Sequence, residues 1–213
     1  METTGTKHTQ RSRATRAALI AAARTLFAER GYAGVGTEEI VRAAGVTRGA
    51  LYHQFRDKTD LFDATVRTVE AELTERIADR LMTTATDPVR ALKAGARAFL
   101  DAFAEPEVER ILLLDAPGVL GWQRWREIGQ EYGLGVITTA LEAAMSAGAL
   151  PARPVPPLAH ILLGALDEAA LMVAHADDPE ATREEMAEAL EHLLDGLLVG
   201  TPARRPPTGA PGG

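Results

Sequence analysis

Two short helical patterns joined by a four-residue turn are the feature that most constrains this fold. The segment TEEIVRAAGVTRGALYHQF runs from Thr37 to Phe55, and Ala-Gly-Val-Thr at residues 44–47 separates its two patterns. Thr37 and Thr47 are each expected to cap a helix, because a threonine hydroxyl accepts a hydrogen bond from a free N–H of the first turn. Helices this short are marginal alone, so neighbouring helices must support them. The pattern is typical of a helix-turn-helix.

The rest of the chain is also patterned for helices, because apolar residues recur every third or fourth position between capping or breaking residues. Gly31 is expected to end one helix, and Asp57, Asp87 and Asp178 are expected to cap others. Helices are predicted over about residues 13–31, 37–45, 47–55, 57–82, 87–104, 106–115, 118–148, 158–176 and 178–199. The seventh could break near residues 133–135, where two glycines lie, or pack closely there. No internal repeat and no convincing strand pattern is found, so the predicted fold class is all-α, with about nine helices.

Charge and composition suggest a division into regions. Residues 1–58 hold ten Lys and Arg against five Asp and Glu, a net charge of +5, whereas residues 59–213 hold 13 against 25, a net charge of −12. A basic segment on an acidic body indicates that one end meets a polyanion. The predicted regions are a disordered arm at 1–12, a helix-turn-helix domain at 13–58, a helical body at 59–200 and a disordered Pro/Gly-rich tail at 201–213.

Several classes of protein become less favoured by what the sequence lacks. The chain has no cysteine, which removes disulfides, thiolate metal sites and a cysteine nucleophile. We find no uninterrupted apolar run of membrane-spanning length and no signal-peptide cleavage pattern, so we expect no membrane partner and a cytoplasmic location. No Ser/His/Asp signature and no metal-ligand spacing stands out, so neither a metal nor a cofactor is predicted.

The second short helix has the residues needed to enter a DNA major groove, which is about 12 Å wide. Its N-terminal N–H groups suit phosphate, and small residues there would allow close approach. Leu51 and Phe55, four residues apart, are expected to face the core. The candidate DNA-binding residues are Thr37, Thr47, Arg48, Gly49, Ala50, Tyr52, His53 and Lys58. Tyr52 could instead pack against the first helix, and His53 could be an ordinary surface residue.

These residues resemble the DNA-binding domain of the tetracycline-repressor (TetR) family of bacterial regulators. The resemblance covers about residues 13–62, and beyond them it extends only to the helical layout. It rests on the ordered set Phe27, Gly31, Thr37, Ile40, Ala43, Gly45, Val46, Leu51, Tyr52, Phe55, Lys58, Leu61 and Phe62. It implies that Thr37 caps its helix and touches phosphate, that Thr47, Arg48, Gly49 and Tyr52 lie at the groove, and that Lys58 binds phosphate. It also implies a ligand-binding and dimerisation domain after the DNA-binding domain.

Within the body, a ligand pocket and a dimer interface are expected. Trp122 and Trp125 are three residues apart and lie on one helix face. The candidate pocket residues are Phe99, Phe103, Trp122, Trp125, Tyr132, Asp167 and Met172, although any one of them could be ordinary core. The polar residues of 160–175 could line either the pocket or the interface. The candidate interface, in which the last two helices pair with their symmetry mates as a four-helix bundle, comprises Ala165, Ala169, Leu190, Leu193, Leu194 and Leu197.

The sequence is therefore best read as a ligand-responsive DNA-binding transcriptional regulator. The expected form is a homodimeric repressor that binds a palindromic double-stranded DNA operator and is released by a small-molecule effector. One alternative is a helical enzyme with an incidental helix-turn-helix. Another is a regulator with no small-molecule effector. The operator, the regulated genes, the identity of the effector and the choice between repression and activation are not encoded in any pattern we can interpret.

Overall fold

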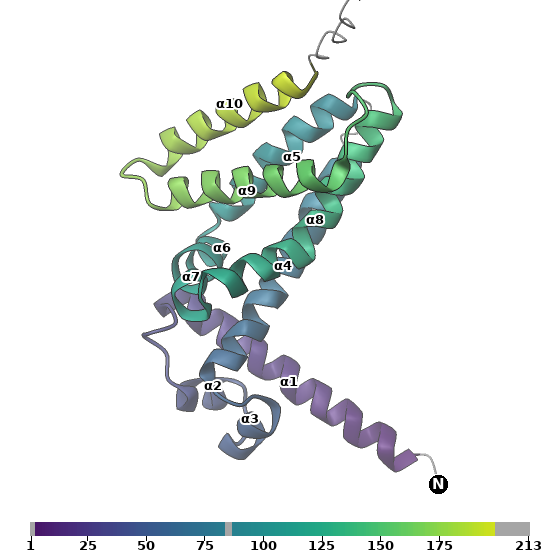
Figure 1. Ribbon diagram of the computed structural model, residues 1–213. Coiled ribbons are helices and arrows are strands. Elements are labelled where there is room, and N and C mark those ends of the chain that lie inside the picture. The colour runs from purple at the N-terminus through teal and green to yellow at the C-terminus, as the bar shows by residue number, and fades with distance from the viewer. Residues whose placement is uncertain (1–2, 84–86, 199–213) are drawn as a thin grey trace, which may run out of the picture.

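A computed structural model describes residues 3–83 and 87–198 (Figure 1). Across these ranges it contains helices and no strand, which confirms the all-α class. The elements are α1 (Thr3–Arg30), α2 (Thr37–Ala43), α3 (Arg48–Gln54), α4 (Lys58–Thr83), α5 (Pro88–Phe103), α6 (Pro106–Val108), the π-helical η1 (Glu109–Asp115), α7 (Ala116–Leu120), α8 (Trp122–Ser146), α9 (Val155–Ala174) and α10 (Pro179–Leu198).

Helices α1, α2 and α3 form a small domain with the first turns of α4, called the head below. Its centre is aromatic: the rings of Phe27 and Phe62 meet edge to face at 5.2 Å, and Tyr32 lies 4.9 Å from Phe62 between ring centroids. Edge-to-face pairs of this kind stabilise beyond the area they bury. Ile40 of α2 and Leu51 of α3 are fully buried in the same core. The two short helices are thus held by α1 and α4, as the helix-turn-helix pattern requires.

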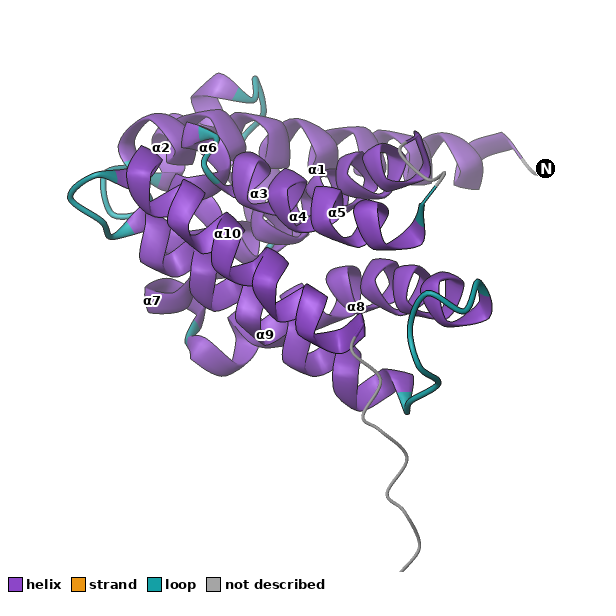
Figure 2. Cartoon of the chain, turned by 90° about the horizontal axis from the view of Figure 1, so that it is seen from above, coloured by secondary structure: helices purple, strands orange, loops and turns teal. Residues whose placement is uncertain are grey.

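Helices α5 to α10 and η1, with the second half of α4, form a larger domain, called the body below. α10 packs on α5 and α9, and α8 packs on α9 and α4. In both views α9 and α10 lie side by side, at the end of the body opposite to the head (Figures 1 and 2). The caps follow the sequence prediction: Asp87 accepts from the N–H of Val89 at 3.0 Å, and Asp178 accepts from that of Ala181 at 3.1 Å.

The predicted disorder of residues 1–12 is wrong from Thr3 onward, because α1 begins there and not near Arg13. No proline interrupts this stretch, and extending an existing helix is far easier than nucleating one. The extension contacts the head, since the Ser12 hydroxyl accepts a hydrogen bond from Gln54 Nε2 at 2.9 Å. The predicted tail, 201–213, lies outside the described residues.

The seventh predicted helix is divided, though not near residues 133–135. The chain turns at Gly121, whose φ of +83° separates α7 from α8. α8 then continues through Gly133, where an added Cβ would lie 3.2 Å from Leu163 Cδ1. The glycine therefore allows close packing of α8 on α9, which was the other option left open by the sequence.

Helix α4 is shared by both domains. Leu61 and Phe62 in its first turns are fully buried in the head, whereas Leu73, three turns later, is buried in the body. The predicted cap is present, because Asp57 accepts a hydrogen bond from the N–H of Asp60 at 2.8 Å. The head and the body thus share one continuous helix.

Two glycines with positive φ offer a matched test of this packing. Gly31 (φ +69°) ends α1 with the Arg110 guanidinium against it, so that an added Cβ would lie 2.0 Å from Nη2, whereas Gly45 (φ +64°) faces open space. Gly45→Ala is expected to lower the free energy of unfolding by about 1–2 kcal/mol through backbone strain alone. Gly31→Ala is expected to lower it further, because Arg110 must also move. Urea unfolding of both variants measures the difference. Equal losses would show that Arg110 does not resist a side chain at position 31.

Candidate DNA interface and ligand cavity

Helix α3 buries one side and exposes the other. Leu51 and Phe55 anchor it in the head core, as their spacing predicted. Thr47 caps it, because the Thr47 hydroxyl accepts a hydrogen bond from the N–H of Ala50 at 3.2 Å. Gly49, beside this cap, is exposed, as is His53 one turn further along. The N-terminal end of α3 therefore presents a cap, small residues and polar side chains to solvent.

Arg48 and Tyr52 lie together on this exposed side. The Tyr52 side chain is 45% exposed, and the Arg48 guanidinium lies 5.7 Å from the centre of its ring. The ion pair of Arg48 with Glu38, at 3.5 Å, joins two side chains that are 66% and 80% exposed. Exposed pairs of this kind contribute little, so Arg48 can exchange Glu38 for another acceptor at small cost.

Thr37 and Lys58 are placed differently from the sequence prediction. The N-cap of α2 is Gly36, and its N–H donates to Glu39 Oε2 at 3.0 Å, so Thr37 is the first helical residue and not the cap. Lys58 Nζ donates to the carbonyl oxygens of Tyr32 at 2.8 Å and Val35 at 2.9 Å. Partial burial lowers the pKa of Lys58. Lys58 therefore holds the turn between α1 and α2, a structural role that the sequence did not reveal.

Arg16 is a supporting residue that the sequence analysis missed. It donates to the carbonyl oxygen of Gln54 at 3.2 Å, and its guanidinium lies 4.3 Å from the centre of the Phe55 ring. Ser12, one helical turn earlier, binds the Gln54 side chain. The spacing of Ser12 and Arg16, four residues apart, was the available signal that this face of α1 supports the end of α3.

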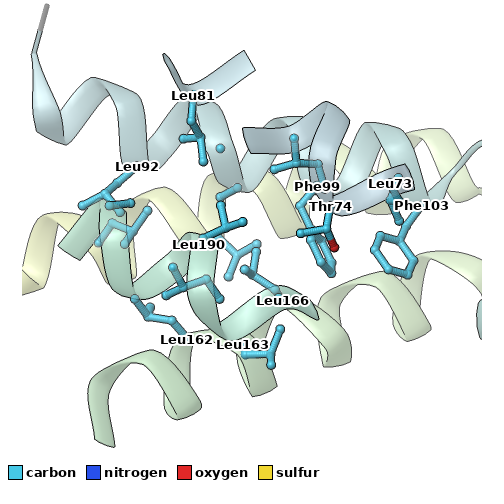
Figure 3. A pocket seen from close by; sticks show the side chains of 18 of the residues that line it. Leu73, Thr74, Leu81, Leu92, Phe99, Phe103, Leu162, Leu163, Leu166 and Leu190 are labelled. Atoms are coloured by element: carbon cyan, nitrogen blue, oxygen red, sulfur yellow. The ribbon is translucent and has the colours of Figure 1, made fainter. Parts of the chain in front are cut away.

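An apolar cavity of about 80 Å³ lies inside the body. Figure 3 shows aromatic and aliphatic side chains converging on it from α4, α5, α9 and α10. The lining residues are Glu70, Leu73, Thr74, Ile77, Leu81, Leu92, Gly95, Ala96, Phe99, Phe103, Gly133, Val136, Ile137, Ala140, Leu162, Leu163, Leu166, Leu190 and Leu194. Its mostly apolar lining with a few polar groups is typical of a site for a small organic molecule.

The cavity corrects most of the predicted pocket residues. Phe99 and Phe103 do line it, with ring centroids 4.3 Å apart. The rings of Trp122 and Trp125 contact each other in a tilted arrangement, with centroids 4.8 Å apart, at the start of α8, and neither residue belongs to the lining. The remaining three predicted residues, Tyr132, Asp167 and Met172, are also absent from the lining.

Helix rotation explains these absences. Tyr132 faces Arg67 of α4, whose guanidinium lies 5.7 Å from the ring centre. Met172 points to solvent and is 47% exposed. Asp167 is half-buried, close enough to the cavity wall for its charge to act on Glu70. Sequence spacing placed these residues on the right helices, but it could not give the rotation of each helix about its axis.

Glu70 is the acidic residue among the lining residues that the sequence analysis missed. Its side chain is only 9% exposed. Burial, reinforced by the charge of Asp167, raises the pKa of Glu70 to about 8 from its ordinary value of 4.5. Burial also raises the pKa of Asp167 to about 6, against the opposing charge of Arg126. The sequence signal for this site was an acid at position 70 among the apolar residues of α4. A buried acid must either find a partner or take up a proton and become neutral.

Three of the six predicted dimer residues are buried within their own chain, and the other three are at least partly exposed. Ala169, Leu190 and Leu194 are buried within their own chain, and the two leucines line the cavity, so these three are corrected to core residues. Leu193 is 46% exposed, and Ala165 and Leu197 are half-buried. The large exposed apolar side chains on α9 are Ile161, 65% exposed, and Met172, 47% exposed.

Ion pairs join the head to the body. Arg24 of α1 binds Glu72 of α4 at 2.5 Å and Glu107 of α6 at 2.5 Å. The N–H of Tyr32, just after α1, donates to Asp115 of η1 at 2.7 Å. Part-buried, charge-assisted hydrogen bonds of this kind are directional, so they fix the angle at which the head meets the body.

Pairs on the other side of α4 connect that helix to α8. Arg124 binds both carboxylate oxygens of Asp63, at 2.7 and 3.1 Å. Arg67 binds both oxygens of Glu131, at 2.9 and 2.6 Å. Because these forks hold two successive turns of α4, a shift of α8 would be transmitted to α4.

A test of the cavity uses Glu70→Gln, which keeps the shape and removes the titration. The folded protein holds a proton on Glu70 that the unfolded chain loses above pH 4.5, so this residue lowers stability progressively as the pH rises toward about 8. The free energy of unfolding of the variant minus that of the parent is therefore expected to grow with pH across this window, by at most about 1.4 kcal/mol per pH unit.

Urea unfolding at pH 5, 6, 7 and 8 provides the measurement. Glu75→Gln is the matched control, because Glu75 is exposed on the same helix. Its difference from the parent is expected to stay constant over this range. A pH-independent difference for Glu70→Gln as well would contradict the placement of an ionisable group in the apolar wall.

Comparison with known proteins supports the division into head and body. The model of "Bacterial regulatory proteins, tetR family" matches residues 19–65, and that of "Tetracyclin repressor-like, C-terminal domain" matches residues 89–197. The transposon Tn10 TetC protein of Escherichia coli is 29% identical over 149 residues, which is 68% of this chain and 73% of that protein.

Solved structures extend the similarity over nearly the whole chain. A TetR-family transcriptional regulator from Pectobacterium atrosepticum is 36% identical, covers 90% of this chain and 97% of its own, and superimposes with a TM-score of 0.80. RolR, solved in complex with resorcinol, shares the fold at 22% identity and a TM-score of 0.70, over 87% of this chain and 89% of its own. The chain therefore belongs to the TetR family of DNA-binding bacterial transcriptional regulators.

Proposed function

We propose that this regulator is a homodimeric repressor whose two heads bind a palindromic operator and whose body binds a small-molecule effector that releases it. The observation that carries the proposal is the geometry of α3, which is anchored by Leu51 and Phe55 and presents Arg48 and Tyr52 outward. A major groove accepts a helix of this kind. The net charge of +5 on residues 1–58 favours contact with phosphates. Operator binding implies a cytoplasmic location.

Different residues of α3 would serve different purposes in the groove. Arg48 can present two N–H groups to guanine O6 and N7, which is the commonest specific contact to a base. The Tyr52 and Thr47 hydroxyls and the N–H of Gly49 in the first turn suit phosphate oxygens, which position the protein without reading sequence. Thr37, His53 and the remaining N–H of Lys58 can contribute at the edges of the groove.

Arg48→Ala tests this assignment. The variant is expected to lose about 1–3 kcal/mol of operator affinity and to relax the preference at one base pair in each half-site. Fluorescence anisotropy on an operator and on its single-base variants measures both effects. Arg153→Ala, which removes the same charge from the exposed loop before α9, is the control and should bind as the parent does. A uniform loss on every sequence would make Arg48 a backbone contact.

Exposed apolar residues on α9 and α10 support a dimer. Ile161 and Met172 are eleven residues apart, three helical turns, and therefore lie on one face of α9, with the half-buried Ala165 between them. Leu193 is exposed on the adjacent α10, with Leu197 one turn further on. Pairing these faces across a two-fold axis would bury all of them in a four-helix bundle.

The dimer also accounts for the unusual composition of α9. By length and hydropathy α9 is the one described helix that could cross a membrane, and 39% of that apolar window is buried inside the chain. Helices this rich in apolar residues are normally covered on more than one side. One side of α9 is covered by α8 and α10, and a symmetry mate would cover the other.

Ile161→Glu combined with Met172→Glu is expected to give a monomer, because four like charges would face one another across the two-fold axis. Sedimentation velocity measures the assembly state, and anisotropy should show weakened operator binding, since each monomer holds only one half-site. Leu114→Glu on η1, where Leu114 is 39% exposed, is the control and should remain a dimer. A double variant that stays dimeric would show that Ile161 and Met172 do not lie in the dimer interface.

Coupling between the sites would run through α4, which lines the cavity with one half and packs in the head with the other. An effector that shifts α4 would change the distance between the two heads and thus their match to successive major grooves. Operator and effector must then oppose each other reciprocally. A regulator with no small-molecule effector remains the second candidate, and it predicts that no compound weakens operator binding.

Selection of genomic fragments by the purified protein tests the function as a whole. A repressor of this kind should enrich one two-fold-symmetric sequence, with half-sites a helical turn or more apart, at moderate salt. Binding to all fragments that disappears as salt rises would mean counterion release alone and would contradict operator recognition.

A further inference from the structure

The cavity wall has two polar side chains among its described lining residues, and both come from α4. Glu70 and Thr74 are four residues apart, so they lie on the same face one turn from each other. Within residues 3–83 and 87–198, neither the Glu70 carboxyl nor the Thr74 hydroxyl has a hydrogen-bond partner. Figure 3 shows the Thr74 oxygen among the hydrocarbon side chains of Phe99 and Leu73. A carboxyl nine-tenths buried with no partner is costly for a fold to retain.

The charges around Glu70 are mostly negative. Asp167 of α9 acts on it across the wall, and no Lys, Arg or His occurs among the described lining residues. Arg126 of α8 acts on Asp167, and Arg67, one turn before Glu70 on α4, is bound to Glu131. An anionic ligand would therefore enter without a counterion, at a high desolvation cost. A neutral ligand would gain a hydrogen bond and would not benefit from Asp167.

We propose that the cavity binds a lipophilic organic base, an amine whose protonated nitrogen donates hydrogen bonds to the Glu70 carboxylate and the Thr74 hydroxyl while its hydrocarbon part lies against Phe99 and the leucines. The inference rests on the proposed function in taking this cavity as the effector site. It goes further in stating the chemical class of the effector. Because both polar groups belong to α4, the ligand nitrogen would act directly on the helix that continues into the head.

Binding of a protonated amine requires the Glu70 carboxyl to lose its proton. Because the pKa of Glu70 is raised to about 8, its carboxyl is neutral at pH 7 in the empty protein. An incoming ammonium keeps its own proton, and Glu70 loses its proton to solvent as the ion pair forms. Binding should therefore release about one proton per site, and affinity should rise about tenfold per pH unit between pH 6 and 7.

Three probes with one hydrocarbon chain separate the possible ligand classes: octylamine, 1-octanol and octanoate. Isothermal titration calorimetry of the full chain at pH 6 and 7, in two buffers of different ionisation enthalpy, gives the affinity and the protons released. The proposal expects octylamine to bind at least tenfold more tightly than 1-octanol, octanoate to bind most weakly, and proton release for octylamine only. Equal or tighter binding of 1-octanol or octanoate, or no binding of octylamine, would overturn it.

Variants assign the effect to Glu70. Glu70→Gln should lower octylamine affinity at least tenfold and remove its pH dependence, while leaving 1-octanol affinity unchanged, which shows that the cavity is intact. Glu75→Gln on the exposed side of α4 should bind all three probes as the parent does. Unchanged octylamine affinity in Glu70→Gln would refute the proposal.

Operator binding is measured separately, by anisotropy with and without saturating octylamine. Binding of octylamine that leaves operator affinity unchanged would support the amine site and count against coupling in the proposed function. If the protein binds the operator but does not bind octylamine, the proposed operator recognition is supported and the amine ligand class is rejected.

Discussion

The structure depends on one continuous helix that belongs to two cores. The first turns of α4 place Leu61 and Phe62 in the aromatic centre of the head, and its later turns form a wall of the body cavity. A helix with all its backbone hydrogen bonds made is stiff along its length, so a displacement at one end appears at the other. Together with the contacts of α1 to α6 and η1, α4 therefore joins the head to the body.

Apolar packing stabilises the head and the body, and polar contacts between them determine the angle at which they meet. The bidentate pairs from Asp63 to Arg124 and from Arg67 to Glu131, with the Arg24 pairs, all lie around the shaft of α4 at partly exposed positions. Each such pair contributes little to stability. Their geometry is nevertheless specific, which suits a junction that, in the proposed function, keeps one angle in one state and adopts another when an effector binds.

Glu70 lowers the stability of the fold, because its carboxyl is buried in the apolar wall of the cavity. An apolar residue there would complete the core and remove the penalty for burying a carboxyl. The chain instead keeps an acid with a strongly raised pKa, a second acid in Asp167 nearby, and an unpaired hydroxyl in Thr74. Departures from the lowest-energy choice are expected at functional positions. In this molecule they occur on the helix that connects the cavity to the head.

The sequence by itself determined the helices, most of their caps and the outward residues of α3, because capping and 3.6-residue periodicity are local properties that neighbouring residues decide. It did not determine the extent of α1, the partners of Lys58 or the residues around the cavity. Trp122 and Met172 looked like pocket residues and point elsewhere, and Leu190 and Leu194 looked like interface residues and are core. These properties depend on how each helix is rotated against its neighbours, which is settled by the packing of residues far apart in the chain.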